Sequence, residues 1–247
     1  MLDQKRGNFA VKVEEFIDPY LGQSWGSLGA RVQTSGKQIS VTLGYPGAGL
    51  KANLAPQLAK FLGVDAVDLE LNFSAGGGSG FGQVKHLVLV SSGKGGVGKS
   101  TTAVNLALAL DAEGAKVGLL DADIYGPSQG MMLGVAEGQR PDIKDGKHFE
   151  PVRAHGLKAM SMSFMTTDKT PMVWRGPMAS GALQQILGQT LWGDLDYLII
   201  DMPPGTGDIH LTLSQKAPIS GAVIVTTPQD IALLDARKGI ETVSYTH

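Results

Sequence analysis

One glycine-rich segment has the residue types and spacing of a loop that binds phosphate groups. Residues 93–100 read Gly-Lys-Gly-Gly-Val-Gly-Lys-Ser, which fits the pattern G-x-x-x-x-G-K-[ST]. The glycines allow backbone N–H groups to turn inward around phosphate oxygens, because no Cβ stands in the way. A helix that begins after the loop would direct its N-terminal dipole at the same anions.

The loop supplies a set of candidate ligands for a nucleoside triphosphate with its metal. We expect Lys99 to reach the β- and γ-phosphates of ATP, and the hydroxyl of Ser100 to ligate Mg²⁺. The predicted cofactors are therefore ATP and magnesium. The residues predicted to bind the nucleotide are Gly93, Lys94, Gly95, Gly96, Val97, Gly98, Lys99, Ser100 and Thr101.

The same glycines also fit a second pattern, the dinucleotide fingerprint G-x-G-x-x-G. Gly93, Gly95 and Gly98 match it, and an acidic residue, Asp121, follows at the end of the next expected strand. Lys99 directly after the last glycine serves a triphosphate and is unexplained in a dinucleotide site. We therefore favour the phosphate loop, with a dinucleotide site or a purely structural glycine turn as the alternatives.

A second segment places a carboxylate where magnesium would need one. The apolar run 196–201 predicts a buried strand that ends in Asp201, and Met-Pro-Pro-Gly-Thr-Gly-Asp follows at 202–208. A carboxylate at this position holds magnesium in phosphate-loop enzymes. It does so through the serine that corresponds to Ser100 or through a bound water. The stiff prolines and permissive glycines suit a loop that responds to the γ-phosphate. Without the phosphate loop, Asp201 would be read only as the end of a strand.

A third segment, Asp-Ala-Asp-Ile-Tyr-Gly-Pro-Ser at 121–128, follows another apolar run. Carboxylates one residue apart on an extended chain point to the same side. We expect Asp123 to orient or activate the water that attacks the γ-phosphate. Asp121 either contacts magnesium or is structural. The predicted metal site is Ser100, Asp123 and Asp201.

Alternating strands and helices must position these segments. The alternation predicts an α/β fold, a mostly parallel sheet with helices on both faces, whose ligands bind at the carboxyl ends of the strands. The expected strands are 87–90, 116–120, 157–160, 197–200 and 222–226, and the expected helices are 99–113, 177–188, 207–215 and 230–242.

A glycine- and serine-rich run at 74–80 has the composition of a linker. We predict a small α+β domain over 1–73, a linker over 74–84 and a phosphate-loop ATPase domain over 85–247. In the first of these, helices are expected near 11–16 and at 50–62, and strands at 38–43 and 66–73. No catalytic constellation stands out there.

Composition limits the remaining functions. The 247 residues are 43% hydrophobic and 18% charged, as in an ordinary globular protein, and the net charge of −2 favours neither nucleic acid nor membrane as a partner. No apolar segment is long enough for a transmembrane helix, and no secretory signal is evident, so we expect a cytoplasmic protein. There is no cysteine, which excludes disulfides and thiolate-held metals or clusters in this chain.

The motifs resemble those of a known group. The early lysine of the loop, Lys94, resembles the deviant Walker A motif of the MinD/ParA/nitrogenase-iron-protein class. Within that class, the segments 121–128, 174–178 and 201–208 are similar to the Mrp/ApbC (Nbp-type) family of ATP-binding iron–sulfur cluster carriers. The resemblance covers roughly residues 85–242. The first 73 residues look more weakly like a MIP18-type domain.

This resemblance implies a slow ATPase that works as a homodimer across the nucleotide site. Lys94 would contact the phosphates of the other subunit's ATP, so Lys94, Lys99 and Asp123 form the expected catalytic set. Residues 226–230 would approach the nucleotide base. The implied partners are cluster scaffold proteins and the apo iron–sulfur proteins that receive clusters, with no nucleic acid and no membrane.

The chain departs from the family in one respect. The family holds its cluster with a Cys-x-x-Cys motif downstream of the helix that begins near Asp230, and this sequence has no cysteine. We expect a [4Fe-4S] cluster only in a full-length parent, of which this chain is a truncated reading frame with a non-native tail at 243–247. The alternatives are a spatial-organiser ATPase resembling MinD or ParA, and a reductase resembling the nitrogenase iron protein.

Overall fold

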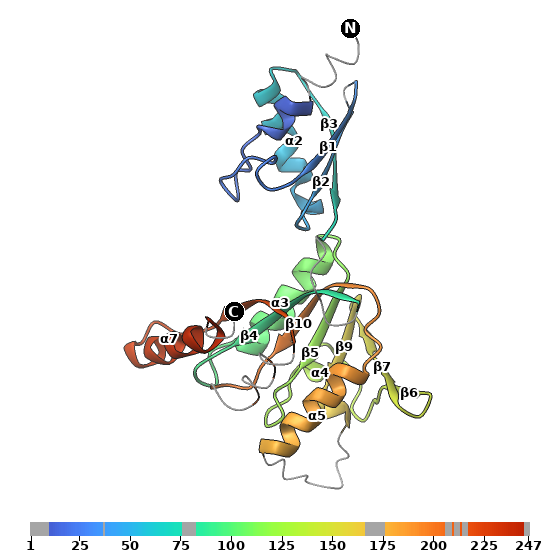
Figure 1. Ribbon diagram of the computed structural model, residues 1–247, viewed down its shortest axis with the longest axis vertical. Helices are drawn as coiled ribbons and strands as arrows, with labels where there is room; N and C mark the ends of the chain where they lie inside the picture. Colours follow the sequence, from blue (N-terminus) through green and yellow to red (C-terminus); the bar gives the residue numbers. More distant parts are fainter. Residues whose placement is uncertain are drawn as a thin grey trace. The chain divides into compact units, whose positions relative to one another are not determined.

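The computed structural model (Figure 1) describes residues 10–36, 38–75, 83–165, 176–205 and 217–244, with Ile209 and Leu213. The chain divides into two compact units, residues 1–76 with 112–115, and residues 77–111 with 116–247. The predicted helix 207–215 lies outside the described residues, apart from two positions. Among the described helices, none has the length and apolarity needed to cross a bilayer.

The larger unit is built on a six-stranded sheet in the order β11-β4-β10-β5-β9-β8. Every neighbouring pair is parallel except β8 and β9, which are antiparallel. The prediction of an α/β fold with a mostly parallel sheet is therefore confirmed. The strands are β4 (Val84–Ser91), β5 (Val117–Asp121), β8 (Val152–Ala154), β9 (Leu157–Ser161), β10 (Leu195–Asp201) and β11 (Ile219–Ile224).

The central strands are buried on both faces, as their continuous apolar runs predict. On β10, Leu198 and Ile200 belong to the main core cluster together with Leu183 and Ile186 of α5. The alternate residue Ile199 points to the opposite face and is also fully buried. The helices of this unit are α3 (Lys99–Ala112), α4 (Gln129–Met132), α5 (Gly176–Gln189) and α7 (Asp230–Ser244), with the short 3₁₀ turn η2 (Met162–Met165).

The register of the sheet places the carboxyl ends of β4, β5 and β10 beside one another. Asp201 at the end of β10 lies opposite Val90 of β4 on one side and Asp121 of β5 on the other. The phosphate loop follows β4, so it emerges at the same edge as both acidic strand ends. This is the edge where parallel sheets bind their ligands.

A hairpin of β6 (Asp142–Lys144) and β7 (His148–Glu150) was not predicted from the sequence. All three residues of β6 are exposed, so no apolar alternation marks it. The turn between the strands contains two left-handed residues, Asp145 (φ 52°) and Gly146 (φ 62°), and Lys144 pairs with Glu150 at 2.6 Å.

The smaller unit contains a three-stranded sheet in the order β1-β2-β3 and one long helix. β2 (Gln38–Leu43) and β3 (Asp68–Phe73) are parallel and joined by η1 (Ala48–Leu50) and α2 (Lys51–Leu62), while β1 (Arg31–Ser35) is antiparallel to β2. β1 was missed in the sequence because none of its residues is buried, so it lacks the hydrophobic alternation of β2.

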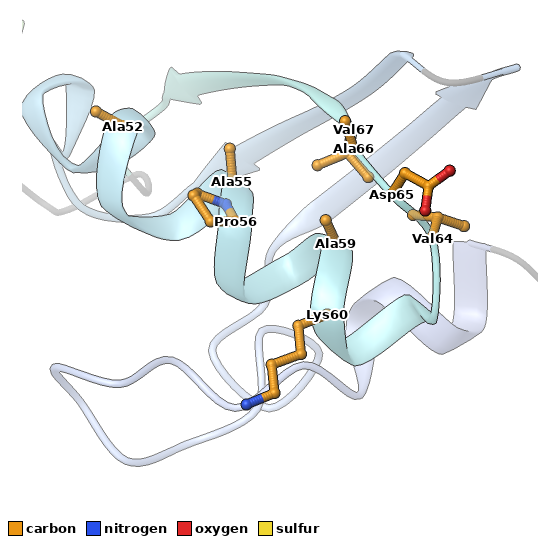
Figure 2. A pocket seen from close by; sticks show the side chains of 9 residues that line it. All are labelled: Ala52, Ala55, Pro56, Ala59, Lys60, Val64, Asp65, Ala66 and Val67. Atoms are coloured by element: carbon orange, nitrogen blue, oxygen red, sulfur yellow. The ribbon is translucent and has the colours of Figure 1, made fainter.

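A groove of about 400 Å³ in this unit lies between α2 and residues 64–67 (Figure 2). Its lining is mostly small and apolar: Ala52, Ala55, Pro56, Ala59, Lys60, Val64, Asp65, Ala66 and Val67. It has neither a glycine-rich loop nor a hydroxyl group to hold a phosphate. The groove therefore lacks the groups that a phosphate-binding site would need.

Candidate functional site

The loops that leave β4, β5 and β10 surround a cavity of about 380 Å³ at the carboxyl edge of the sheet. Its lining residues are Ser92, Gly95, Gly96, Gly98, Lys99, Ser100, Thr101, Asp123, Gly126, Ser128, Met132 and Pro204. The phosphate loop forms one wall and the segment after β5 forms another. Three segments that the sequence singled out are thus brought together at one place.

Two glycines of the phosphate loop are required by their backbone conformation. Gly96 (φ 77°) and Gly98 (φ 90°) adopt left-handed conformations that other residues rarely adopt. A Cβ on Gly95 would meet no atom within 4 Å, so it would enter the open space of the cavity. The backbone at these positions is therefore open to a ligand that approaches closely.

Gly93 is a glycine for a different reason. A Cβ there would lie 2.4 Å from the Cβ of Asp235 in α7 and 3.0 Å from the Asp235 carbonyl carbon. Gly93 is not in the cavity lining. Its role in this structure is close packing against α7, which the phosphate-loop pattern did not predict.

Lys99, the first residue of α3, is buried in the wall of the cavity with 6% of its surface exposed. Its Nζ lies 2.5 Å from Oδ1 of Asp201 and 3.7 Å from Oδ2 of Asp123, and it donates to the Ser100 hydroxyl at 3.3 Å. A buried ammonium needs such counter-charges, because burial alone strongly disfavours an isolated ion. The Lys99 ammonium group is therefore held at the cavity wall by two carboxylates.

Asp201 is fully buried, and both of its carboxylate oxygens are engaged. Oδ1 faces Lys99, and Oδ2 accepts a hydrogen bond of 2.8 Å from Nε2 of Gln129. The chain after Asp201 returns to the phosphate loop, where the Gly205 N–H donates to the carbonyl of Ser92 at 2.8 Å. The carboxylate that the sequence assigned to magnesium thus sits behind Lys99 and does not line the cavity.

Asp121 has a structural role in this arrangement. It is fully buried, and burial, followed by the nearby charge of Asp201, raises its pKa to about 6 against the opposing hydrogen bonds. It accepts hydrogen bonds from the backbone N–H groups of Asp123 (3.1 Å), Ser128 (2.9 Å) and Gln129 (3.0 Å) and from the Ser161 hydroxyl (3.2 Å). These bonds hold the segment 121–129 in place, and this segment forms the wall of the cavity that contains Asp123.

The structure brings together most of the residues predicted from the sequence. Those that line the cavity are Gly95, Gly96, Gly98, Lys99, Ser100, Thr101 and Asp123, whereas Gly93, Lys94, Val97 and Asp201 do not. Lys94 is exposed to solvent. Residues 226–230 are described but are absent from the lining, and 174–175 and 206–208 lie outside the described residues.

Sequence reasoning missed Gln129, which bonds to two of the site's elements. Its Nε2 donates to the carbonyl of Ser100 at 2.9 Å as well as to Asp201. Gln129 directly follows the acidic segment 121–128, and this adjacency was the only available signal. Nothing about a glutamine in a four-residue helix indicates that its side chain reaches the first turn of α3 and the end of β10.

The residues present fit ATP with magnesium. The loop offers an open backbone cradle, Lys99 offers a cation, and Ser100 offers a hydroxyl. The buried Oε1 of Gln129 has no hydrogen-bond partner among the described residues. No group of three or more His, Asp or Glu side chains in the described part of the chain is arranged to hold a metal. A hard cation would therefore need oxygens from a bound phosphate to complete its shell, as magnesium does with nucleotides.

Comparisons with known proteins identify a family. The family model described as NUBPL iron-transfer P-loop NTPase, in the ParA group, matches residues 83–247. An iron–sulfur cluster carrier protein of Pseudomonas fragi is 72% identical over 162 residues, which are 66% of this chain and 56% of that protein. A protein of the same name from Escherichia coli K12 is 59% identical over 197 residues, 77% of this chain and 53% of that protein.

The chain spans about half the length of these two curated relatives. A longer match is the iron–sulfur cluster carrier protein of Deinococcus radiodurans, 46% identical over 91% of this chain and 67% of that protein. Among solved structures, a nucleotide-binding protein of Archaeoglobus fulgidus in complex with ADP is 40% identical. The match covers 66% of this chain and 63% of the Archaeoglobus chain, with a TM-score of 0.57.

Proposed function

The chain belongs to the family of NUBPL iron-transfer P-loop NTPases, and on this premise we propose that it binds and hydrolyses ATP with magnesium as the nucleotide-driven part of an iron–sulfur cluster carrier. The names of its relatives support the carrier role, and the cavity supports the nucleotide. The ATPase reaction gives ADP and inorganic phosphate. Its recipients would be apo iron–sulfur proteins.

One observation carries the proposal: Lys99 is buried between two carboxylates directly beneath an open glycine cradle. Burying an ammonium costs free energy that Asp201 and Asp123 offset. A phosphate group in the cradle would offer Lys99 a stronger set of anionic partners. We expect Lys99 to exchange Asp201 for the phosphates when ATP binds.

The remaining residues would then act in defined roles. The backbone N–H groups of Gly95, Gly96 and Gly98 would surround the phosphates, and the Ser100 hydroxyl would ligate magnesium. Asp201, no longer paired with Lys99, would be the carboxylate that holds the magnesium ion. Bound magnesium would neutralise charge on the phosphate oxygens as the γ-phosphoryl group departs.

The water that attacks the γ-phosphate needs a group to orient it. Asp123 is the carboxylate in the cavity lining, and it keeps a hydrogen bond from the Gly126 N–H at 3.2 Å that fixes one of its oxygens. We assign Asp123 to water orientation. We assign Lys94, which is exposed beside the cavity, to the nucleotide of a second subunit in a homodimer.

The cluster is cargo in this proposal and not a cofactor of these residues. The sequence contains no cysteine, so none of its side chains can supply a thiolate ligand. The chain therefore contributes the nucleotide chemistry, and cluster binding requires thiolates from elsewhere in the assembly. A cytoplasmic location and cluster scaffold proteins as donors complete the proposal.

Phosphate release from Mg·ATP by the purified chain tests the ATPase proposal. We expect slow turnover in the wild type and loss of turnover in Asp123→Asn, with ATP binding kept in that variant because Asp123 is assigned to water and not to phosphate. Asp194→Asn, an exposed carboxylate in an ion pair outside the cavity, is the matched control. Equal turnover in the wild type, Asp123→Asn and Lys99→Ala would contradict the mechanism.

A further inference from the structure

Gln129 is the first residue of α4 and has only 1% of its surface exposed. Its side chain joins two elements that are far apart in the sequence. Nε2 donates to the carbonyl of Ser100 in α3 at 2.9 Å and to Oδ2 of Asp201 in β10 at 2.8 Å. The side chain therefore links the first turn of α3 to the end of β10, behind the residues that line the cavity.

These two partners fix the orientation of the amide. A carbonyl and a carboxylate are both acceptors, so only the NH₂ end of the amide can face them. If the amide were turned over, Oε1 would face two acceptors and both bonds would be lost. Oε1 is consequently committed to the other side, where it is buried and has no partner among the described residues. A buried amide oxygen without a donor costs free energy, which a water molecule at that place can offset.

The backbone of Gln129 is held as firmly as its side chain. Its N–H donates to Oδ2 of Asp121 at 3.0 Å, and the N–H of Ser128 donates to the same oxygen at 2.9 Å. Asp121 itself ends β5 at the level of Asp201. A rigid connection thus runs from the end of one strand, through Gln129, to the end of the next.

We propose that Gln129 is a positioning residue for magnesium: through Nε2 it holds Asp201, the carboxylate assigned to the metal, and through the Ser100 carbonyl it ties Asp201 to the residue whose hydroxyl would ligate the cation. This inference rests on the proposed function. Asp201 has Lys99 on one oxygen and Gln129 on the other. When Lys99 turns to the phosphates, Gln129 keeps the carboxylate in place. Ordering of such outer partners is how proteins tune metal affinity.

The test is the magnesium dependence of nucleotide binding in Gln129→Met, which keeps the length of the side chain and removes the amide. The probe is a MANT-labelled β,γ-imido analogue of ATP, titrated into the full chain in EDTA and again with increasing Mg²⁺. We expect the apparent affinity for Mg²⁺ to fall by about 3- to 10-fold, the effect of one or two hydrogen bonds. The affinity for the analogue in EDTA stays within about 2-fold. Gln139→Met, an exposed glutamine, is the control and leaves both unchanged.

A second measurement does not depend on the folding of a variant. In wild-type protein with ¹⁵N-labelled glutamine, the side-chain amide signal of Gln129 is assigned by its contacts with Ser100 and Asp201. We expect this signal to shift when Mg²⁺ is added to the protein–analogue complex, and to shift less when the analogue is added in EDTA. An unchanged signal on addition of Mg²⁺ would overturn the inference.

The outcomes separate this inference from the proposed function. If the wild type binds the analogue with magnesium but Gln129→Met has the same magnesium dependence, only the role of Gln129 is overturned. Equal losses of affinity with and without magnesium would show that Gln129 supports the fold of the loop and does not serve the metal. If the wild type binds no analogue at all, the proposed function fails, and the inference fails with it.

Discussion

Replacing Lys99 with methionine removes the cation that compensates two buried carboxylates and keeps most of the side-chain volume. Asp201 lies 2.5 Å from Nζ with its side chain fully buried, and Asp123 lies 3.7 Å away with its side chain 12% exposed. In the nucleotide-free protein, the variant leaves Asp201 with Gln129 as its described side-chain donor. The perturbation therefore acts on stability before any ligand is present.

The expected cost follows from the burial of the pair. Removing one partner of a buried ion pair destabilises a protein by about 3–5 kcal/mol, because the other charge is left without compensation. With a urea m-value of about 2 kcal/mol per molar, this is a fall of roughly 2 M in the unfolding midpoint of the larger unit. Adding Asp201→Asn to Lys99→Met should recover part of the loss, with a coupling of about 1–3 kcal/mol.

Urea unfolding at neutral pH, followed by circular dichroism and without nucleotide, is the assay. Lys116→Met is the matched control, because Lys116 pairs with Asp194 at 2.8 Å with both side chains more than half exposed. The control should leave the midpoint unchanged, since exposed ion pairs contribute little. If Lys99→Met unfolds at the same midpoint as Lys116→Met, the account of Lys99 as a buried, compensated cation is wrong.

Three further predictions concern the walls of the site. Burial raises the pKa of Asp121 to about 6, above the ordinary 3.8, so this group adds stability fully at low pH and loses it as the pH rises through about 6. The stability of the wild type minus that of Asp121→Asn should therefore fall by up to about 3 kcal/mol between pH 4 and pH 7, measured by urea unfolding across that range; a constant difference would refute the shift. Gly93→Ala should lower stability by about 1–3 kcal/mol in the same assay, because its Cβ would lie 2.4 Å from Asp235 of α7. Gly95→Ala should keep the wild-type melting temperature and weaken ATP binding, because its Cβ would enter the cavity; the reverse pattern for these two glycines would contradict their assigned roles.

The sheet and the phosphate loop could be predicted because their signals are local. Continuous apolar runs such as 87–90 and 197–200 are typical of buried parallel strands, and both lie within observed strands. The loop pattern combines conformation and chemistry in consecutive residues, so the sequence alone singles out Gly96, Gly98 and Lys99, which lie in the cavity lining. Strand ends that share one edge then follow from the parallel topology.

Features that depend on distant packing could not be predicted. The pairing of Lys99 with Asp201 joins residues 102 positions apart, and no local pattern encodes it. The packing of Gly93 on α7 is of the same kind, and so is the reach of Gln129 to α3 and β10. The strands β1 and β6 escaped prediction because they have no buried residues and hence no hydrophobic period.

The most direct test of the central claim, that the cavity around Lys99 is a Mg·ATP site, is equilibrium binding of ATP to the chain by isothermal titration calorimetry. Our account predicts saturable binding of one nucleotide per chain, with a higher affinity when magnesium is present. In Ser100→Ala, the affinity should fall at least 10-fold at high magnesium and should change little in EDTA. Gly95→Ala should weaken binding in both conditions. Absence of saturable binding, or binding that neither substitution changes, would contradict it.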